Sequence, residues 1–209
     1  YQMAIVRQTQ VNPKAGLTFS TGLRNILRQD PDVILVGEIR DAETVNIAVE
    51  AALTGHLVFS TIHTNDAAGA VTRLLDMEIE PFLISSALLG ILAQRLVRSI
   101  CEKCKESYAV NPELIKKFGV KTEKSTFFRG KGCADCKRTG YSKRVGLFEL
   151  LLVDEDIRHL ILAKASNKDI KTLALKKGMI SMRIDGLRKA EKGITTIEEV
   201  LKATLEEEE

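Results

Sequence analysis

The sequence contains no apolar run that approaches the roughly 18–20 residues needed to span a bilayer. Its first residues also lack the pattern of a secretory signal peptide. We therefore expect any role at a membrane to depend on a partner. A strong excess of one charge is missing as well, because 31 basic and 28 acidic residues give a net charge of only +3. That surplus is too small to indicate nucleic-acid binding.

The charge that is present is unevenly distributed. The 209 residues have an ordinary globular composition, with 44% hydrophobic and 28% charged residues, and are enough for one medium domain or two to three small ones. Residues 99–145, however, contain 12 lysines and arginines against 5 acidic residues. This basic segment also holds all four cysteines.

The cysteines form two pairs, Cys101-x-x-Cys104 and Cys133-x-x-Cys136. Each pair has the spacing of a zinc knuckle, and two such pairs can present four thiolates to one Zn²⁺. The 28 residues between the pairs exceed the usual ribbon spacing, but the cost of loop closure grows slowly with length. Two disulfides are the alternative, which a reducing compartment disfavours. We therefore predict one structural zinc site.

A strand, a helix and a second strand are predicted near the amino end. Residues 33–36, Val-Ile-Leu-Val, form an apolar run between Asp-Pro-Asp and Gly-Glu, which is typical of a strand buried on both faces of a parallel sheet. Asp41 is expected to cap the following helix and Gly55 to end it. Residues 57–62 are expected to form the next strand. The pattern predicts a βαβ unit with parallel strands.

This unit places two ionisable residues at one edge of a sheet. Glu38 follows the first predicted strand and His63 follows the second. The carboxyl ends of parallel strands share an edge, and ligands bind at that edge in open α/β sheets. Glu38 and His63 are therefore candidate site residues.

The remaining chain is predicted to contain helices and two further strands. Pro81 is expected to open a helix, and Thr195 or Thr196 to form a capping box with Glu198 or Glu199. One helix is expected to begin at about residue 66, and further helices are expected over residues 81–92, 154–164, 167–177, 180–191 and 196–204. The expected strands cover residues 94–100 and 145–153.

Three motifs in order carry a resemblance to a known family. They are Arg-Asn-Ile-Leu-Arg-Gln-Asp-Pro-Asp at 24–32, Val-Gly-Glu-Ile-Arg-Asp at 36–41, and residues 54–66, which begin Thr-Gly-His and end Ser-Thr-Ile-His-Thr-Asn-Asp. They resemble the arginine-rich, Walker B and histidine boxes of the secretion ATPases. From about residue 1 to residue 204 the chain is similar to the ATPases of type II secretion and type IV pilus assembly. The paired cysteines favour an assembly or secretion motor over a retraction motor within this family.

The resemblance implies an α/β fold. We expect a partial RecA-like P-loop NTPase sheet in residues 1–98, a small zinc-binding insertion in residues 99–145, and a returning strand with a helical carboxyl-terminal subdomain in residues 146–209.

The chain departs from the family in one motif. A P-loop needs Gly-x-x-x-x-Gly-Lys-Ser/Thr, whose backbone N–H groups and lysine hold phosphates, and the sequence contains no such string. In the family this loop lies just upstream of the segment that would align with Tyr1. We therefore expect this chain to be a carboxyl-terminal piece of a longer protein, inactive by itself.

The resemblance also implies an activity and partners for the intact protein. It implies a homo-oligomeric motor, a hexamer, that hydrolyses ATP with Mg²⁺. The motor would lie in the cytoplasm, peripheral to the inner membrane, and would act on the machine through a platform protein in that membrane. Glu38 would position either a water of the Mg²⁺ shell or the attacking water, and which of the two stays open. His63 would contact the γ-phosphate or report its presence. Secretion and pilus assembly are not separated by the sequence.

Three arginines are candidates for binding nucleotide or a neighbouring subunit. Arg24 and Arg28 are four residues apart, and Arg40 follows the Walker-B-like glutamate. Guanidinium groups present paired donors that suit phosphates and carboxylates. His56 is a weaker candidate, because it can equally close the turn after Gly55.

A different class of function remains as an alternative. The basic cysteine segment could be a zinc-dependent module that recognises nucleic acid or acidic protein surfaces without catalysis. Its aromatic residues do not form a recognisable stacking platform; they are Tyr108, Phe118, Phe127, Phe128 and Tyr141.

Overall fold

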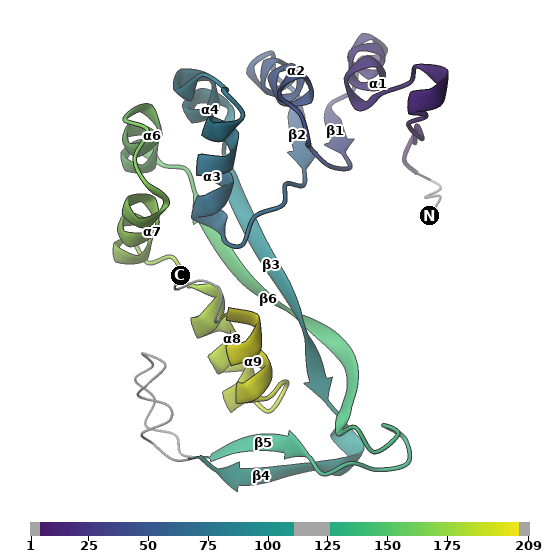
Figure 1. Cartoon of the computed structure of the whole chain (residues 1–209), viewed down its shortest axis with the longest axis vertical. Coiled ribbons are helices and arrows are strands. Elements are labelled where there is room, and N and C mark those ends of the chain that lie inside the picture. The colour runs from purple at the N-terminus through teal and green to yellow at the C-terminus, as the bar shows by residue number, and fades with distance from the viewer. Residues whose placement is uncertain (1–4, 111–125, 205–209) are drawn as a thin grey trace. The chain divides into compact units, whose positions relative to one another are not determined.

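The computed structural model describes residues 5–110 and 126–204, and its internal contacts divide the chain into two compact units (Figure 1). Unit 1 comprises residues 1–64, 68–89 and 153–170, and unit 2 comprises residues 65–67, 90–152 and 171–209. The division into segments 1–98, 99–145 and 146–209 stays a prediction. No helix in the described ranges is long and apolar enough to cross a membrane.

Unit 1 contains the predicted βαβ unit. Strands β1 (Val33–Val36) and β2 (Leu57–Ser60) pair in parallel, joined by helix α2 (Ala42–Leu53). The Asp41 side chain accepts a hydrogen bond from the Thr44 N–H and caps α2, and Gly55 takes a left-handed φ of 103° after it. These local predictions are confirmed, although β2 ends two residues earlier than expected.

The prediction that β1 is buried on both faces is wrong. Ile34 and Val36 pack with Leu23 of helix α1 (Phe19–Ile26) and with α2 in one hydrophobic core. Val33 and Leu35 on the opposite face are 56% and 66% exposed. Among the described elements, helices α1 and α2 cover one face of this strand and nothing covers the other. A continuous apolar run is therefore present although only one face is buried.

The rest of unit 1 is helical. The prediction of a helix over residues 81–92 is wrong, because the helix stops at Ala87 and strand pairing begins at Gly90. The other elements are η1 (Pro13–Ala15), η2 (Leu27–Gln29), α3 (Ala67–Asp76), α4 (Pro81–Ala87) and α6 (Glu155–Leu162), followed by α7 (Asn167–Lys176), whose residues divide between the units.

Unit 2 is built on an antiparallel ribbon of two long strands, β3 (Gly90–Ile100) and β6 (Tyr141–Leu152). Both strands are longer than predicted, because cross-strand pairing extends over residues that carry no strand signal of their own. The short turn η3 (Glu102–Cys104) leads into a second antiparallel pair, β4 (Lys105–Ala109) and β5 (Thr126–Gly130), which the sequence did not predict.

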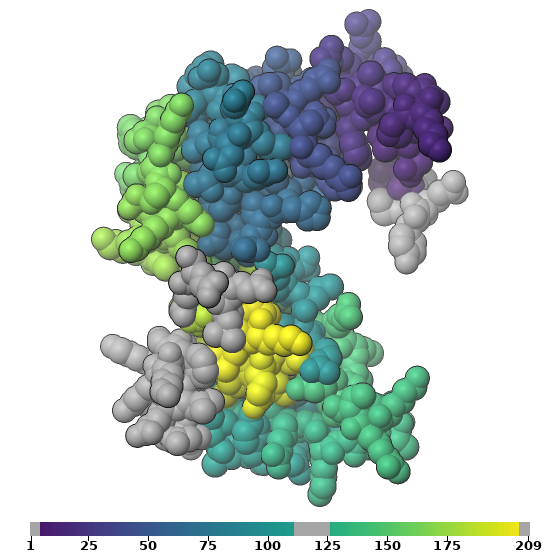
Figure 2. Space-filling model, viewed as in Figure 1, coloured from purple at the N-terminus to yellow at the C-terminus, as the bar shows by residue number. Residues whose placement is uncertain are grey.

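Two helices cover one face of this ribbon. Helices α8 (Met182–Glu191) and α9 (Ile197–Thr204) bring Met182 and Val200 against Val97 and Leu147 of the strands in one core (Figure 1). Figure 2 shows α9, in yellow, directly beside the teal and green surface of the strands. The predicted helices of this region are confirmed to within a few residues.

The start of α9 departs from the predicted capping box. The Thr196 hydroxyl accepts a hydrogen bond from the Glu199 N–H, as the pattern predicts. The Glu199 carboxylate does not return to the cap, however, and instead binds Arg98 of β3. The Thr195 hydroxyl donates to the Arg98 carbonyl, so the segment before α9 is fastened to the edge of β3.

Glu149 is a buried carboxylate in the middle of β6, only 1% exposed. Its Oε1 accepts a hydrogen bond from the N–H of Ala67 at 3.1 Å, and its Oε2 accepts one from the N–H of Met182 at 3.3 Å. These residues open α3 and α8, whose first N–H groups have no partner inside their own helices. One carboxylate thus satisfies donors at two helix starts, where negative charge is also favoured by the helix dipoles.

Replacing Glu149 with Leu should lower the free energy of unfolding by about 1–3 kcal/mol for each N–H left without an acceptor. Glu149→Gln should cost less, because its amide oxygen can still accept one of the two hydrogen bonds. Urea denaturation of both variants measures the difference. Glu50→Gln on the exposed surface of α2 is the control, and equal unfolding free energies for all variants would contradict the assignment.

Candidate functional site

The loops after β1 and β2 are joined to one another by hydrogen bonds. The Ile39 N–H donates to the Thr61 carbonyl at 2.9 Å, and the Thr61 hydroxyl donates to the Gly37 carbonyl at 2.7 Å. The Ser60 hydroxyl donates to the Val36 carbonyl at 3.0 Å. These contacts continue the parallel pair beyond its last ladder position and hold the loop carrying Glu38 beside the loop carrying His63.

Glu38, Arg40 and His63 come together at this edge. Oε2 of Glu38 lies 2.7 Å from Nε of Arg40 and 3.5 Å from Nε2 of His63. The Glu38 side chain is 25% exposed, whereas that of His63 is 88% exposed. Both contacts use Oε2, and in the described part of the chain Oε1 makes no hydrogen bond or ion pair. The carboxylate is therefore held in place with one oxygen available to a ligand.

The partners of Glu38 also set its protonation. The hydrogen bond from Arg40 lowers the pKa of the Glu38 carboxyl below its ordinary value, with a smaller contribution from His63. The side chain is therefore a carboxylate at neutral pH, which is the form that accepts hydrogen bonds from water or coordinates a hard cation.

The other predicted residues lie apart from this cluster. Arg24 of α1 pairs with Glu43 at 3.0 Å on the surface, and Arg28 is exposed in η2. Nδ1 of His56 lies 3.0 Å from the Ala51 carbonyl at the end of α2. His56 therefore closes the turn at the end of α2, which was the second of the two roles expected for it. It contacts none of the cluster residues.

The hydroxyls of Ser60 and Thr61, which join the two loops, were not predicted from the sequence. Nor was the direct ion pair between Arg40 and Glu38. A Ser-Thr pair at a strand end is a weak signal, because these residues favour turns in general. The proximity of Arg40 in sequence to Glu38 was the only available indication of the ion pair.

The four cysteines form a single compact cluster. Their sulfur atoms all lie within 4.8 Å of one another. The sulfurs of Cys101 and Cys133 are 3.9 Å apart, those of Cys104 and Cys136 are 3.9 Å apart, and those of Cys133 and Cys136 are 3.7 Å apart. Four sulfurs placed tetrahedrally about 2.3 Å from Zn²⁺ are separated by roughly 3.8 Å. All four are free thiols, so the disulfide alternative is not what the structure shows. The donor set fits a tetrahedral metal ion.

Backbone groups around the cluster support the thiolate form. The N–H groups of Cys133 and Gly140 donate to Sγ of Cys136 at 3.2 and 3.3 Å, and that of Gly132 donates to Sγ of Cys104 at 3.3 Å. The Cys133 N–H is the main reason that the pKa of the Cys136 thiol falls to about 6, whereas burial raises the pKa of Cys104 to about 12. Such hydrogen bonds to sulfur are the outer contacts expected around a metal site.

Two glycines make this arrangement possible. A Cβ on Gly130 would overlap the backbone of Gly140, and Gly140 has a left-handed φ of 78°. The Gly140 carbonyl accepts a hydrogen bond from the Cys101 N–H, which ties the two cysteine pairs together through the main chain.

Each aromatic residue of the segment that the structure describes is either buried or has one ring face covered by a cation. Phe127 is buried in the core of unit 2. Arg129, Lys105 and Arg98 lie 5.3, 5.1 and 4.1 Å from the ring centroids of Tyr108, Phe128 and Tyr141, respectively, so one face of each ring is already covered by a cation. Phe118 lies outside the described residues.

Comparison with known proteins identifies the relatives of this chain. A family model described as Type II/IV secretion system protein matches residues 1–202. The chain is 54% identical over 209 residues to the "Type IV pilus assembly ATPase PilB" of Thermus thermophilus, covering 99% of this chain and 24% of that protein. It is 54% identical over 202 residues to the "Type II secretion system ATPase E" of Vibrio cholerae, and this match covers 96% of this chain and 40% of that protein. The chain thus spans well under half the length of these relatives.

Solved structures of secretion and pilus ATPases are also similar. The pilus retraction motor PilT, solved with bound ADP, is 30% identical with a TM-score of 0.62, over 89% of this chain and 43% of that one. The Legionella pneumophila ATPase DotB is 27% identical with a TM-score of 0.63, and the match covers 95% of this chain and 45% of that one. These likenesses confirm the expected α/β, RecA-like fold class. On these grounds the chain is a member of the Type II/IV secretion system protein family.

Proposed function

We propose that the complete protein is a hexameric motor ATPase that powers type II secretion or type IV pilus assembly, and that this chain supplies part of its catalytic edge. The observation that carries the proposal is the convergence of Glu38 and His63 at the carboxyl edge of a parallel strand pair. Relatives named as ATPases, 54% identical over nearly the whole chain, support the reaction.

The residues at this edge fit ATP with Mg²⁺. Glu38 offers an anionic oxygen, the donor type that Mg²⁺ or a water in its shell requires. Arg40 and His63 offer N–H groups to phosphate oxygens. Mg²⁺ would supply neutralisation of the charge that develops on the phosphates. No phosphate-binding loop is encoded in this sequence, so the phosphates themselves depend on residues outside it.

Within the reaction, the chain's residues act mainly by position. Phosphoryl transfer needs the attacking water and the phosphate to be held in line, with little covalent chemistry by the protein. Glu38, fixed through Oε2, can orient a water through Oε1. His63, largely exposed beside it, can donate to the γ-phosphate. Arg24 and Arg28 are proposed to reach nucleotide or a neighbouring subunit.

The cysteine cluster is proposed to hold one structural zinc. A four-thiolate site has no open coordination position, so its role would be architectural. It would brace the basic segment for contact with a neighbouring subunit or with an inner-membrane platform protein, on the cytoplasmic side. The nucleic-acid alternative is less favoured, because Tyr108, Phe128 and Tyr141 each already have one ring face covered by one of the chain's own cations.

The isolated 209-residue chain should show no ATP turnover, whereas the complete protein should hydrolyse ATP. Without P-loop N–H groups and lysine, nothing in the chain holds the β- and γ-phosphates against Glu38. Phosphate release by the purified chain and the complete protein, at equal concentrations, measures this.

A Glu38→Gln variant of the isolated chain controls for contaminating ATPases. Background release equal in both forms of the chain would agree with the proposal. Turnover by the isolated chain that disappears in Glu38→Gln would contradict it, because the edge would then act without a phosphate-binding loop.

A further inference from the structure

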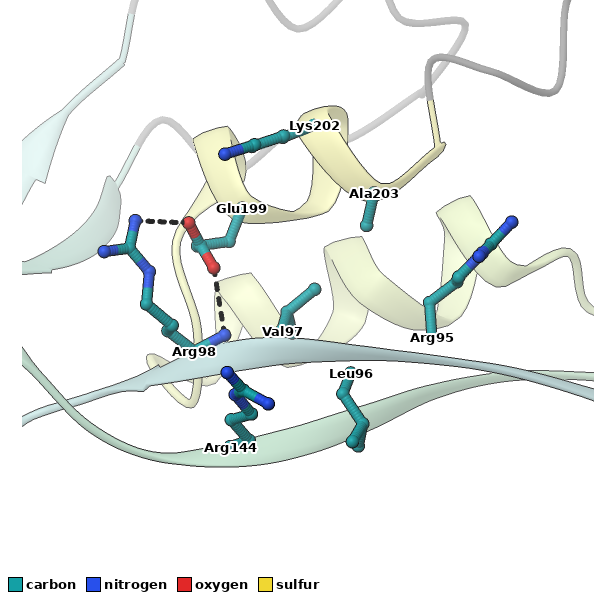
Figure 3. A pocket seen from close by; sticks show the side chains of 8 residues that line it. All are labelled: Arg95, Leu96, Val97, Arg98, Arg144, Glu199, Lys202 and Ala203. Atoms are coloured by element: carbon teal, nitrogen blue, oxygen red, sulfur yellow. Dashed lines mark hydrogen bonds and ion pairs between the residues drawn. The ribbon is translucent and has the colours of Figure 1, made fainter. Parts of the chain in front are cut away.

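A pocket of about 430 Å³ lies between β3 and α9 in unit 2 (Figure 3). Its apolar lining consists of Leu96 and Val97 of β3 and Ala203 of α9. Its polar lining is almost entirely cationic, with four basic side chains and one carboxylate; these are Arg95, Arg98, Arg144, Lys202 and Glu199. This volume falls in the range of small-molecule sites.

The single carboxylate is committed to one of the four cations. Oε1 of Glu199 lies 2.6 Å from a terminal nitrogen of Arg98, and Oε2 accepts the Arg98 backbone N–H at 2.9 Å (Figure 3). The Arg98 guanidinium also lies over the Tyr141 ring. Arg98 is therefore fixed and its charge is balanced, which leaves three cations in the lining without a balancing carboxylate.

These three cations are not neutralised within the described residues. Arg95 donates to the Asn65 side-chain oxygen at 2.8 Å, which orients the guanidinium but brings no negative charge. Arg144 and Lys202 make no hydrogen bond or ion pair with any described residue. Lys202 contributes to lowering the pKa of the Glu199 carboxyl, but that carboxylate is already bound to Arg98. The pocket lining therefore carries a surplus of about three positive charges, and the side chains of Arg144 and Lys202 are exposed and accessible to a ligand.

The register of the β3–β6 pair adds electrostatic repulsion between two of the cations in this lining. Arg98 and Arg144 are direct cross-strand partners in the β3–β6 ladder. Like charges placed opposite each other destabilise a sheet. Glu199 balances Arg98 but makes no contact with Arg144 that would balance the second charge. An unfavourable local arrangement of this kind is expected at functional sites more than elsewhere.

We propose that this pocket is a binding site for a phosphate-bearing anion, separate from the Glu38 edge. Guanidinium forks bind phosphate oxygens in pairs, and a lysine adds a point charge. A multiply charged phosphate group neutralises a surplus of three charges better than one carboxylate does. The pocket shares no residue with the cluster of Glu38, Arg40 and His63.

The test uses inorganic pyrophosphate as the probe. Binding to the 209-residue chain is measured by titration calorimetry, with thermal unfolding as a second readout. The wild-type chain should bind pyrophosphate and gain thermal stability from it. Arg144→Gln and Lys202→Gln should each weaken binding by about tenfold or more, since each removes a charged hydrogen-bond donor. Arg144→Gln should also unfold at the same or a higher temperature without pyrophosphate, because it removes the repulsion from Arg98.

Two control variants locate the binding. Arg188→Gln on α8 removes the same charge from an exposed position outside the pocket and should leave affinity unchanged. Arg40→Gln removes a cation from the Glu38 edge, so it would weaken any pyrophosphate bound at that edge, whereas Arg144→Gln and Lys202→Gln would not. The proposal is overturned if Arg40→Gln weakens binding while Arg144→Gln and Lys202→Gln do not, or if all four variants weaken it equally.

Two further probes define the ligand class and its source. Citrate, which has a similar charge on carboxylates, should bind more weakly than pyrophosphate; equal or tighter citrate binding would overturn the phosphate assignment. Vesicles of phosphatidylcholine with and without phosphatidylglycerol distinguish a lipid headgroup from a soluble phosphate. Vesicle binding that needs both phosphatidylglycerol and Arg144 would identify the headgroup, and pyrophosphate binding alone would identify a soluble ligand.

Discussion

Glu38→Gln in the complete protein should reduce ATP hydrolysis by about 10²-fold or more, the range expected when a positioned base or water-orienting group is removed. ATP binding should persist, because glutamine keeps the shape of the side chain and the phosphates are held by other residues. Steady-state phosphate release and equilibrium binding of a labelled ATP analogue measure the two quantities separately.

Glu50→Gln provides a matched control. Glu50 is exposed on the surface of the same βαβ unit, in α2, and contacts no residue of the Glu38 edge, so its loss should change hydrolysis little. Wild-type hydrolysis by Glu38→Gln would remove this carboxylate from the mechanism. Loss of binding and hydrolysis together would mean that Glu38 has a structural role at the loop.

Replacing any one of the four cysteines by serine should release the metal and unfold the segment around it. Elemental analysis of the wild-type chain should give about one zinc per chain, and each single variant should lose it, because a structural zinc site couples metal binding to folding. The four variants should behave alike, since all four sulfurs contact one ion. Zinc content and amide hydrogen exchange of β4 and β5 measure the two effects.

Asp135→Asn is the control for this result. Asp135 lies between Cys133 and Cys136 and pairs with Lys103, but its side chain is largely exposed and the cluster has four sulfur ligands without it. The variant should retain zinc. Disulfides in freshly purified protein would refute the metal site, and zinc loss without any change in exchange would refute its importance for folding.

The features that the sequence predicted well have local causes. Asp41 caps α2 and Gly55 ends it, because capping and left-handed turns depend on a few neighbouring residues. The parallel pairing of β1 and β2 followed from the βαβ connection, and Glu38 and His63 meet at the predicted edge. The Cys-x-x-Cys spacing similarly brought four sulfurs together across the long intervening segment.

The features that the sequence did not predict depend on partners far along the chain. Glu199 has a local capping partner available at Thr196, yet its carboxylate binds Arg98, which lies 101 residues away. The full length of β3 is set by pairing with β6, so the signal for its first residues lies in another segment. Burial of β1 on one face only is decided by which layers pack on it, and an apolar run cannot indicate that.

The most direct test of the account is a structure of the complete protein with Mg²⁺ and a non-hydrolysable ATP analogue. The account predicts that the γ-phosphate lies within hydrogen-bond distance, about 3 Å, of His63 Nε2. It also predicts that Oε1 of Glu38 contacts the attacking water or a water of the Mg²⁺ shell. A γ-phosphate out of reach of His63, with Glu38 contacting neither water, would contradict the assignment of this edge as the catalytic site.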